Sequence, residues 1–141
     1  MEKQKLLFFY LNTGAGHRNT INSTSKHISY DDNFECIKID ALSQSNKFVK
    51  FLLQDFYNKI QNKFKFLFEI LYFINKNKFN VYISNFFVYL ILKNKIKKFI
   101  EKEKPNKIIS AHFFLNKPIK NILKELKLNI PFVTIVTDPF T

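Results

Sequence analysis

Three residues that can move protons each follow an apolar segment of the chain. His17 comes after the run Leu6 to Leu11 and a glycine turn. His112 follows the segment KIISA, and Asp138 follows the segment PFVTIVT. Histidine and carboxylate side chains are the usual general bases of enzymes. Because ligands of an open parallel sheet bind at the carboxyl ends of its strands, these positions predict one cleft shared by the three side chains.

The glycine turn has the pattern of a strand, a tight reversal and the start of a helix. Gly14 and Gly16 are the only glycines in the chain. Glycine lets backbone approach a ligand closely, and the free N–H groups at a helix start favour negative charge. Asn19 stands where a dinucleotide fingerprint has its third glycine, and no Walker sequence follows. Two interpretations stay open: an ordinary tight turn, or an acceptor and phosphate loop formed by Gly14, Ala15, Gly16 and Arg18.

Each of the three proton-transfer residues also has a structural interpretation. An isolated histidine is more often a hydrogen-bond partner than a catalyst, and an aspartate before proline can start a turn. His17 has a further argument for chemistry, because the dipole of a helix start disfavours the positive imidazolium and a base must be neutral. His27 has no assigned role. No metal site is expected, because the histidines lack ligand spacing and Cys36 is the only cysteine.

The elements that must position these residues alternate between strand and helix. An unbroken apolar run predicts a strand buried on both faces, and apolar residues spaced by three and four predict helices. The expected strands are 6–11, 34–39, 107–111 and 131–137, and the expected helices are 18–30, 47–75, 81–104 and 116–128. In the first helix, the residues expected to face the sheet are Ile21 and Ile28, and those expected to face outward are Asn22, Ser25 and Ser29. This order predicts a single α/β domain over residues 1–141, with a Rossmann-like parallel sheet flanked by helices.

Positive charge is concentrated in the middle of the chain. The net charge is +12, of which residues 1–46 contribute 0, residues 47–104 contribute +9 and residues 105–141 contribute +3. Such a basic region usually meets phosphate on lipid or nucleic acid. A nucleic-acid partner is not expected, because the aromatic residues lie on predicted helices and Arg18 is the only arginine.

The predicted helix 47–75 is apolar over more than one face and is bordered by lysines. A buried core helix and a helix lying in a membrane interface both fit this pattern. The residues expected to bind the membrane are Lys59, Lys63, Lys65, Phe66, Phe68 and Phe73. The longest later apolar run, Phe86 to Leu92, is far shorter than the ~20 residues of a membrane span. With one cysteine and no secretory signal, the sequence indicates a reducing compartment, so we expect a cytoplasmic protein. The basic, aromatic region 47–104 predicts that it binds the membrane peripherally.

Three motifs together resemble a known family. GAGHR after the first strand, IISAHFF and VTIVTD are similar to segments of the N-terminal domain of monogalactosyldiacylglycerol synthases and bacterial processive diacylglycerol glucosyltransferases. The resemblance implies the N-terminal half of a GT-B glycosyltransferase, which handles diacylglycerol at the membrane. A C-terminal domain, not seen in this sequence, would hold the UDP-sugar. The family inverts the configuration of the sugar and needs no metal or other cofactor for the chemistry.

The resemblance also assigns expected roles. It implies that Gly14, Gly16 and His17 match the glycine loop and candidate base, and that His112 and Asp138 line the cleft. Phe113 stands where many members have proline, and the motif that begins at Asp138 does not continue to its usual histidine. The expected function is transfer of a hexose from a UDP-sugar to diacylglycerol, with this chain inactive alone. The alternatives are a non-catalytic module that binds anionic lipid, or a truncated remnant.

Overall fold

A computed structural model describes residues 3–12, 15–43 and 78–137, except for the side chains of residues 78–85, 87 and 88. The strands are β1 (Gln4–Tyr10), β2 (Phe34–Asp40), β3 (Lys107–Ser110) and β4 (Phe132–Thr134). The helices are α1 (Ala15–Ile28), α5 (Lys78–Glu103) and α6 (Phe113–Glu125).

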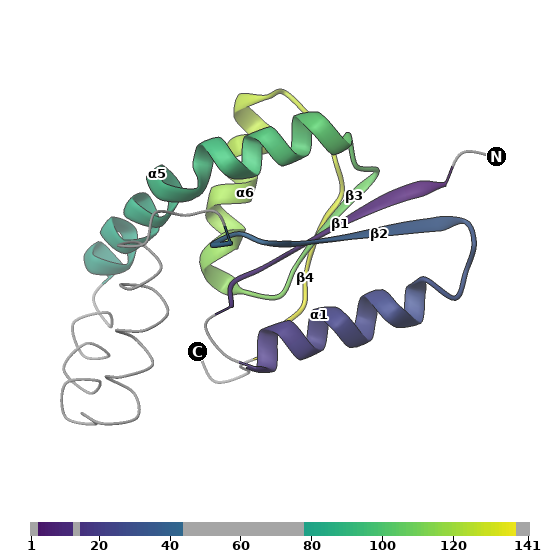
Figure 1. The fold of residues 1–141 in the computed structure, drawn as a ribbon. Coiled ribbons are helices and arrows are strands. Elements are labelled where there is room, and N and C mark those ends of the chain that lie inside the picture. The colour runs from purple at the N-terminus through teal and green to yellow at the C-terminus, as the bar shows by residue number, and fades with distance from the viewer. Residues whose placement is uncertain (1–2, 13–14, 44–77, 138–141) are drawn as a thin grey trace.

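The four described strands form one parallel sheet in the order β2-β1-β3-β4 (Figure 1). The chain runs from β1 outward to β2, then crosses over β1 to form β3 on its other side. The direction of winding therefore reverses between β1 and β3, which is the switch point where open α/β sheets bind ligands. The Rossmann-like α/β fold expected from the sequence is confirmed.

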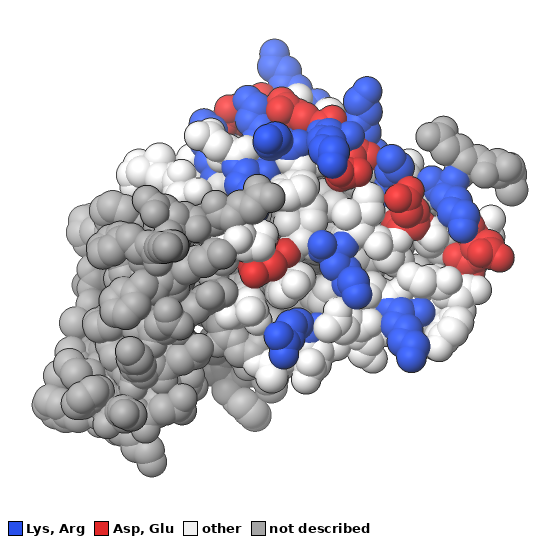
Figure 2. All heavy atoms as spheres, viewed as in Figure 1, with Lys and Arg blue, Asp and Glu red and all other residues white. Residues whose placement is uncertain are grey.

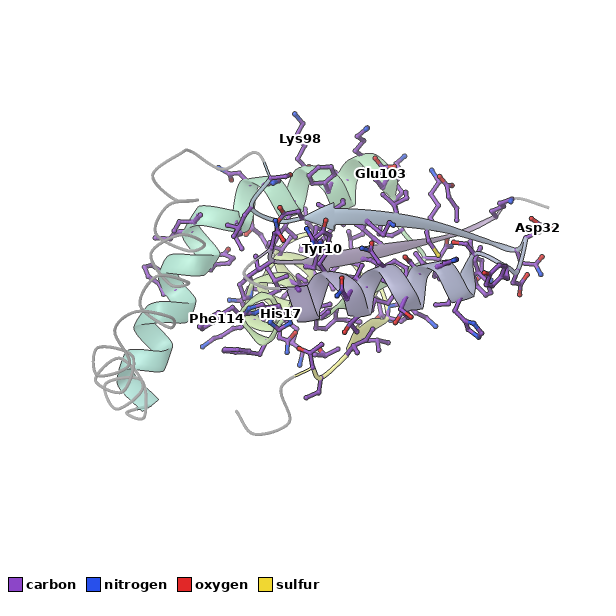
Figure 3. All side chains as sticks on the ribbon, turned by 60° about the horizontal axis from the view of Figure 1, so that its bottom comes forward. Tyr10, His17, Asp32, Lys98, Glu103 and Phe114 are labelled. Carbon is purple, nitrogen blue, oxygen red and sulfur yellow. The ribbon has the colours of Figure 1, made fainter. Side chains whose placement is uncertain are left out.

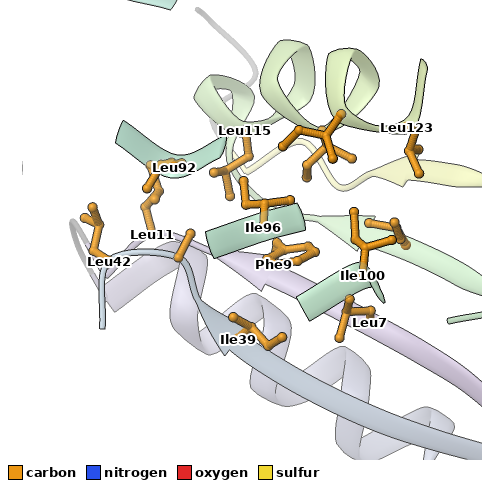
Figure 4. Packing of buried hydrophobic residues seen from close by; sticks show 14 residues of the cluster. Leu7, Phe9, Leu11, Ile39, Leu42, Leu92, Ile96, Ile100, Leu115 and Leu123 are labelled. Carbon is orange, nitrogen blue, oxygen red and sulfur yellow. The ribbon is translucent and has the colours of Figure 1, made fainter. Parts of the chain in front are cut away.

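The apolar run of β1 is buried on both faces of the sheet, as its unbroken pattern predicts. Leu7 and Phe9 point to the face covered by α5 and α6, where they join the larger core cluster (Figure 4). Leu6 and Phe8 point to the opposite face, where they pack with Ile21 of α1. The two helical layers are thus held to one central strand.

Helix α5 contacts the sheet through one apolar stripe. Leu92, Ile96 and Ile100 recur every four residues and are fully buried. Ion pairs also join α5 to α6. The carboxylate of Glu125 lies 2.8 Å from the ammonium nitrogen of Lys93 and 3.5 Å from that of Lys97. This part of the surface mixes basic and acidic side chains (Figure 2).

A third lysine of α5 holds the end of β2. The ammonium group of Lys95 donates to the backbone carbonyls of Asp40 and Ala41, each at 3.0 Å, and to the hydroxyl of Ser43 at 3.1 Å. The positive charge of Lys95, which the sequence analysis counts in the basic region, therefore stabilises the fold.

Three expected details are wrong. Helices α1, α5 and α6 each begin three residues before the expected starts. The expected outward position of Ser25 is also wrong, because the residue is buried and its hydroxyl bonds back to the carbonyl of Asn22 at 3.2 Å. This bond satisfies the hydroxyl within the helix, so a serine fits where the pattern suggests solvent. Strand β4 is shorter than expected, and only Ile135 extends its pairing to β3.

The basic helix predicted at 47–75 lies outside the described residues, together with its six proposed lipid-binding residues: Lys59, Lys63, Lys65, Phe66, Phe68 and Phe73. Among the described helices, none has both the length and the apolar character to cross a bilayer.

Candidate functional site

The candidate site lies at the switch point, where two helices begin side by side. Helix α1 starts after β1 and carries His17 in its first turn. Helix α6 starts after β3, and His112 is its N-cap residue. The centroids of the two imidazole rings are 4.3 Å apart, and the ring planes are tilted by 43°. The structure thus brings these two rings together, while a shared functional site with Asp138 stays a prediction. Figure 3 places His17 beside Phe114 at this end of the sheet.

The partner atoms of His17 fix which of its nitrogens carries a proton. Its Nδ1 lies 2.7 Å from the backbone carbonyl oxygen of Ala111 and 2.8 Å from the hydroxyl oxygen of Thr137. A carbonyl oxygen can only accept, so Nδ1 must donate its hydrogen. In the neutral ring the lone pair is then on Nε2, the arrangement that many catalytic histidines use.

His112 has the opposite tautomer, because its Nδ1 accepts a hydrogen bond from the backbone N–H of Phe114 at 3.3 Å. The proton of the neutral ring is therefore on Nε2. The backbone of His112 is also fixed, since its N–H and its carbonyl both bond to the hydroxyl of Ser110. The bond from the N–H of Phe114 to the His112 ring caps α6, because it satisfies a donor that the first turn of a helix leaves without a partner.

His112 stays uncharged in this environment. The residue is buried, and burial followed by the nearby charge of His17 lowers its pKa to about 3. Its ring is also stacked against the rings of Phe113 and Phe114, with centroids 5.0 Å and 5.4 Å away. The site therefore joins a neutral hydrogen-bond donor to a histidine whose acceptor nitrogen is Nε2.

The glycine loop is described only in part. Ala15, Gly16 and Arg18 are exposed in the first turn of α1, and Gly14 lies outside the described residues. No described glycine has a positive φ, and a Cβ on Gly16 would meet no atom within 4 Å. The fold itself therefore does not require glycine at position 16, and the exposed backbone there is open to a ligand.

Asp138 lies outside the described residues, so its place in the cleft stays a prediction. Thr137, which the sequence reasoning missed, contacts His17 directly. Its signal was weak, since in the sequence it is simply the last residue of the segment PFVTIVT before Asp138. No group of residues in the described part of the chain could hold a metal ion.

A parallel sheet flanked by helices places this domain in the Rossmann-like α/β class, consistent with the N-terminal half of a GT-B glycosyltransferase. The sequence model of the monogalactosyldiacylglycerol (MGDG) synthase family matches residues 17–141. The chain belongs to this family, which associates it with glycolipid synthesis by a glycosyltransferase. No curated protein and no solved structure matched the chain significantly. The match begins at His17, so the resemblance of the preceding glycine loop rests on its sequence alone.

Proposed function

We propose that this domain is the acceptor-binding half of a glycosyltransferase that transfers a hexose from a UDP-sugar to diacylglycerol, with His17 as the general base. The observation that carries the proposal is the contact between Nδ1 of His17 and the carbonyl oxygen of Ala111 at 2.7 Å. This contact leaves the lone pair of the neutral ring on Nε2, which is the form that can take a proton. Family membership supports the reaction class.

The proposed reaction needs one proton to be removed from the acceptor. The free hydroxyl of diacylglycerol attacks the anomeric carbon of the sugar, and the bond from that carbon to UDP breaks. Nε2 of His17 takes the hydroxyl proton as the new glycosidic bond forms, and UDP leaves with the electron pair. The configuration at the anomeric carbon inverts in a single displacement. Asp138 is the alternative base or the group that orients His17.

The first turn of α1 also has a proposed role in binding the phosphate groups of the UDP-sugar. The first-turn backbone of α1 at Ala15 and Gly16 and the side chain of Arg18 would face the phosphate groups, since a helix N-terminus favours negative charge. The UDP-sugar itself would be held by a C-terminal donor domain. We expect the 141-residue chain to transfer no sugar when it is assayed alone.

The test of the proposed base is a fusion of this chain to a donor domain from the same family. Sugar transfer from UDP-glucose and UDP-galactose to diacylglycerol in vesicles is then measured at steady state. His17→Ala should lower the turnover number by roughly 10²–10⁴-fold, the usual contribution of a positioned base. His27→Ala is the matched control, because His27 is exposed on the same helix. Near-normal turnover of His17→Ala would show that His17 is structural.

We also propose that the chain is a cytoplasmic protein that binds the membrane surface through residues 47–104, which carry a net charge of +9. Each lysine near an anionic surface contributes about 1 kcal/mol, so a few lysines are sufficient. Since Lys93 and Lys97 are paired with Glu125 and Lys95 bonds to the end of β2, the contribution must come mainly from the other lysines of this region.

Sedimentation with vesicles tests this second part. The chain should bind vesicles that contain phosphatidylglycerol, bind neutral phosphatidylcholine vesicles much more weakly, and dissociate as salt is added. Equal binding to both kinds of vesicle, insensitive to salt, would contradict an electrostatic mechanism. If vesicles bind while every fusion to a donor domain is inactive, the non-catalytic lipid-binding module becomes the better description.

A further inference from the structure

His112 is buried, yet one of its polar atoms has no use in the fold. The residue is 6% exposed. Its backbone and its Nδ1 are engaged by Ser110 and Phe114, and no hydrogen bond among the described residues uses Nε2. In the described part of the chain no buried side-chain nitrogen or oxygen lacks a partner, so Nε2 must belong to the small part of the residue that reaches the surface. An N–H group held in this way is available to a ligand.

The neighbour of this N–H group is the proposed base. The ring centroids of His112 and His17 are 4.3 Å apart, and the two rings have opposite tautomers because their Nδ1 atoms have opposite partners. One Nε2 therefore donates and the other accepts. A hydroxyl group matches both, since it carries one hydrogen and two lone pairs. One oxygen can lie about 2.8 Å from each of two nitrogens that are up to about 5.6 Å apart, which suits rings in contact.

We propose that His112 is a second catalytic residue, whose Nε2–H donates to the oxygen of the acceptor hydroxyl while Nε2 of His17 accepts its hydrogen. This inference rests on the proposed function and names a further residue for the same reaction. The two bonds fix the direction in which the hydroxyl points its remaining lone pair. As the proton moves to His17, negative charge develops on the oxygen and the bond from His112 strengthens.

The neutral state of His112 suits this role. Because burial and the charge of His17 lower its pKa to about 3, it remains a donor without a positive charge. A cationic neighbour would oppose the formation of imidazolium on His17, whereas a neutral N–H does not. The cap to Phe114 keeps the tautomer fixed, since loss of the Nε2 hydrogen to Nδ1 would remove the acceptor of that N–H.

The test uses nitrogen-15 NMR of the histidine rings in the 141-residue chain, which contains three histidines. At neutral pH the spectra should show the Nδ1–H tautomer for His17 and the Nε2–H tautomer for His112. Soluble 1,2-dihexanoylglycerol is then added as the probe, with trihexanoylglycerol as the control that has no hydroxyl. The probe should shift the Nε2 signals of both site histidines and leave the exposed His27 unchanged, while the control should shift neither site histidine.

A pair of variants separates the donor from the cap. His112→Asn keeps an oxygen that can accept from the N–H of Phe114 but loses Nε2–H, whereas His112→Ala loses both. Binding of dihexanoylglycerol should weaken by roughly 3- to 10-fold in His112→Asn, the effect of one hydrogen bond. If His112→Ala fails to fold, His112→Asn and the titration of the unmodified chain still decide the question.

The outcomes distinguish this inference from the proposed function. If the probe shifts His17 but not His112, or if His112→Asn binds as tightly as the unmodified chain, the role of His112 is refuted and the acceptor site stands. If His112 has the Nδ1–H tautomer, the donor assignment is wrong. If the probe shifts neither histidine, the acceptor site itself is not here, and the proposed function fails together with the inference.

Discussion

The buried His112 should make the domain sensitive to mild acid. Its pKa is lowered to about 3 in the fold, first by burial and then by the charge of His17, against an ordinary value of 6.5. Above pH 6.5 the ring is neutral in both states and has no effect on the pH dependence. Below that pH His112 binds a proton in the unfolded chain but not in the folded chain. Stability is therefore lost as the pH falls from about 6.5 toward about 3, by about 1.4 kcal/mol per pH unit.

The size of the effect follows from these two values. Between pH 7 and pH 5, protonation of His112 in the unfolded state should lower the free energy of unfolding by about 2 kcal/mol. Urea slopes for small proteins are about 1–3 kcal/mol per molar, so the midpoint of unfolding should move by about 1 M. Other groups titrate in the same range, and the comparison must therefore be made against a variant that lacks only this one.

His112→Asn is that variant, because asparagine can cap α6 and has no charge at any pH. Urea unfolding followed by circular dichroism at pH 7 and pH 5 should show a loss smaller by about 2 kcal/mol in His112→Asn than in the unmodified chain. His27→Asn is the control, since the exposed His27 should leave the acid loss unchanged. Equal acid loss in the unmodified chain and in His112→Asn would refute the view that a buried, neutral His112 supports the fold.

Three further predictions concern the same site and its supporting helices. Gly16→Ala should raise the free energy of unfolding by about 0.5–1 kcal/mol in thermal or urea unfolding, because the position is helical and the added Cβ would clash with no neighbouring atom. A loss of stability would contradict this reasoning. Lys127→Gly should stabilise the chain by up to about 1 kcal/mol, because Lys127 follows the C-cap residue Leu126 of α6 with a φ of 54°. Lys124→Gly inside the helix should destabilise the chain by about as much. Thr137→Val should lower the turnover number of the fused enzyme by less than about tenfold with an unchanged KM, because only one of two bonds to His17 is lost. Thr137→Ser should restore the turnover number. A full loss of activity in Thr137→Val would mean that Thr137 does more than position the base.

The sequence predicted the sheet well because its pattern has one physical cause. The run Leu6 to Leu11 is apolar at every position, and only a strand covered on both faces buries all of it. The alternation of strands and helices then limits the topology to a parallel sheet with crossover helices. The pair His17 and His112 was predictable for the same reason, since each follows a buried strand.

The starts of the helices were predicted less well, because caps depend on contacts that the sequence does not reveal. Pro118 is the sixth residue of α6, and proline is normally confined to the first turn, so the pattern favoured a later start. Capping by His112 moves the start to Phe113. Histidine is not among the residues that usually cap helices, so nothing in the sequence indicated this role.

The bonds that hold His17 could not be predicted from side-chain types. One partner is the backbone carbonyl of Ala111, which any residue at that position would provide. The other is Thr137, three residues after the end of β4, with no distinctive sequence pattern around it. Both become visible only when the order of the strands is known.

The order of the strands also explains why the base is tied to the sheet. Strands β1 and β3 are distant in sequence but paired in space, with Phe9 opposite Ser110. Ala111 continues this pairing, since its N–H donates to the carbonyl of Phe9 at 3.2 Å while its own carbonyl accepts from His17. A shift in the register of β3 would therefore move the acceptor of His17 and the cap of α6 together. Because both histidines contact the segment that follows one buried strand, the packing of the core contributes to the separation of their rings.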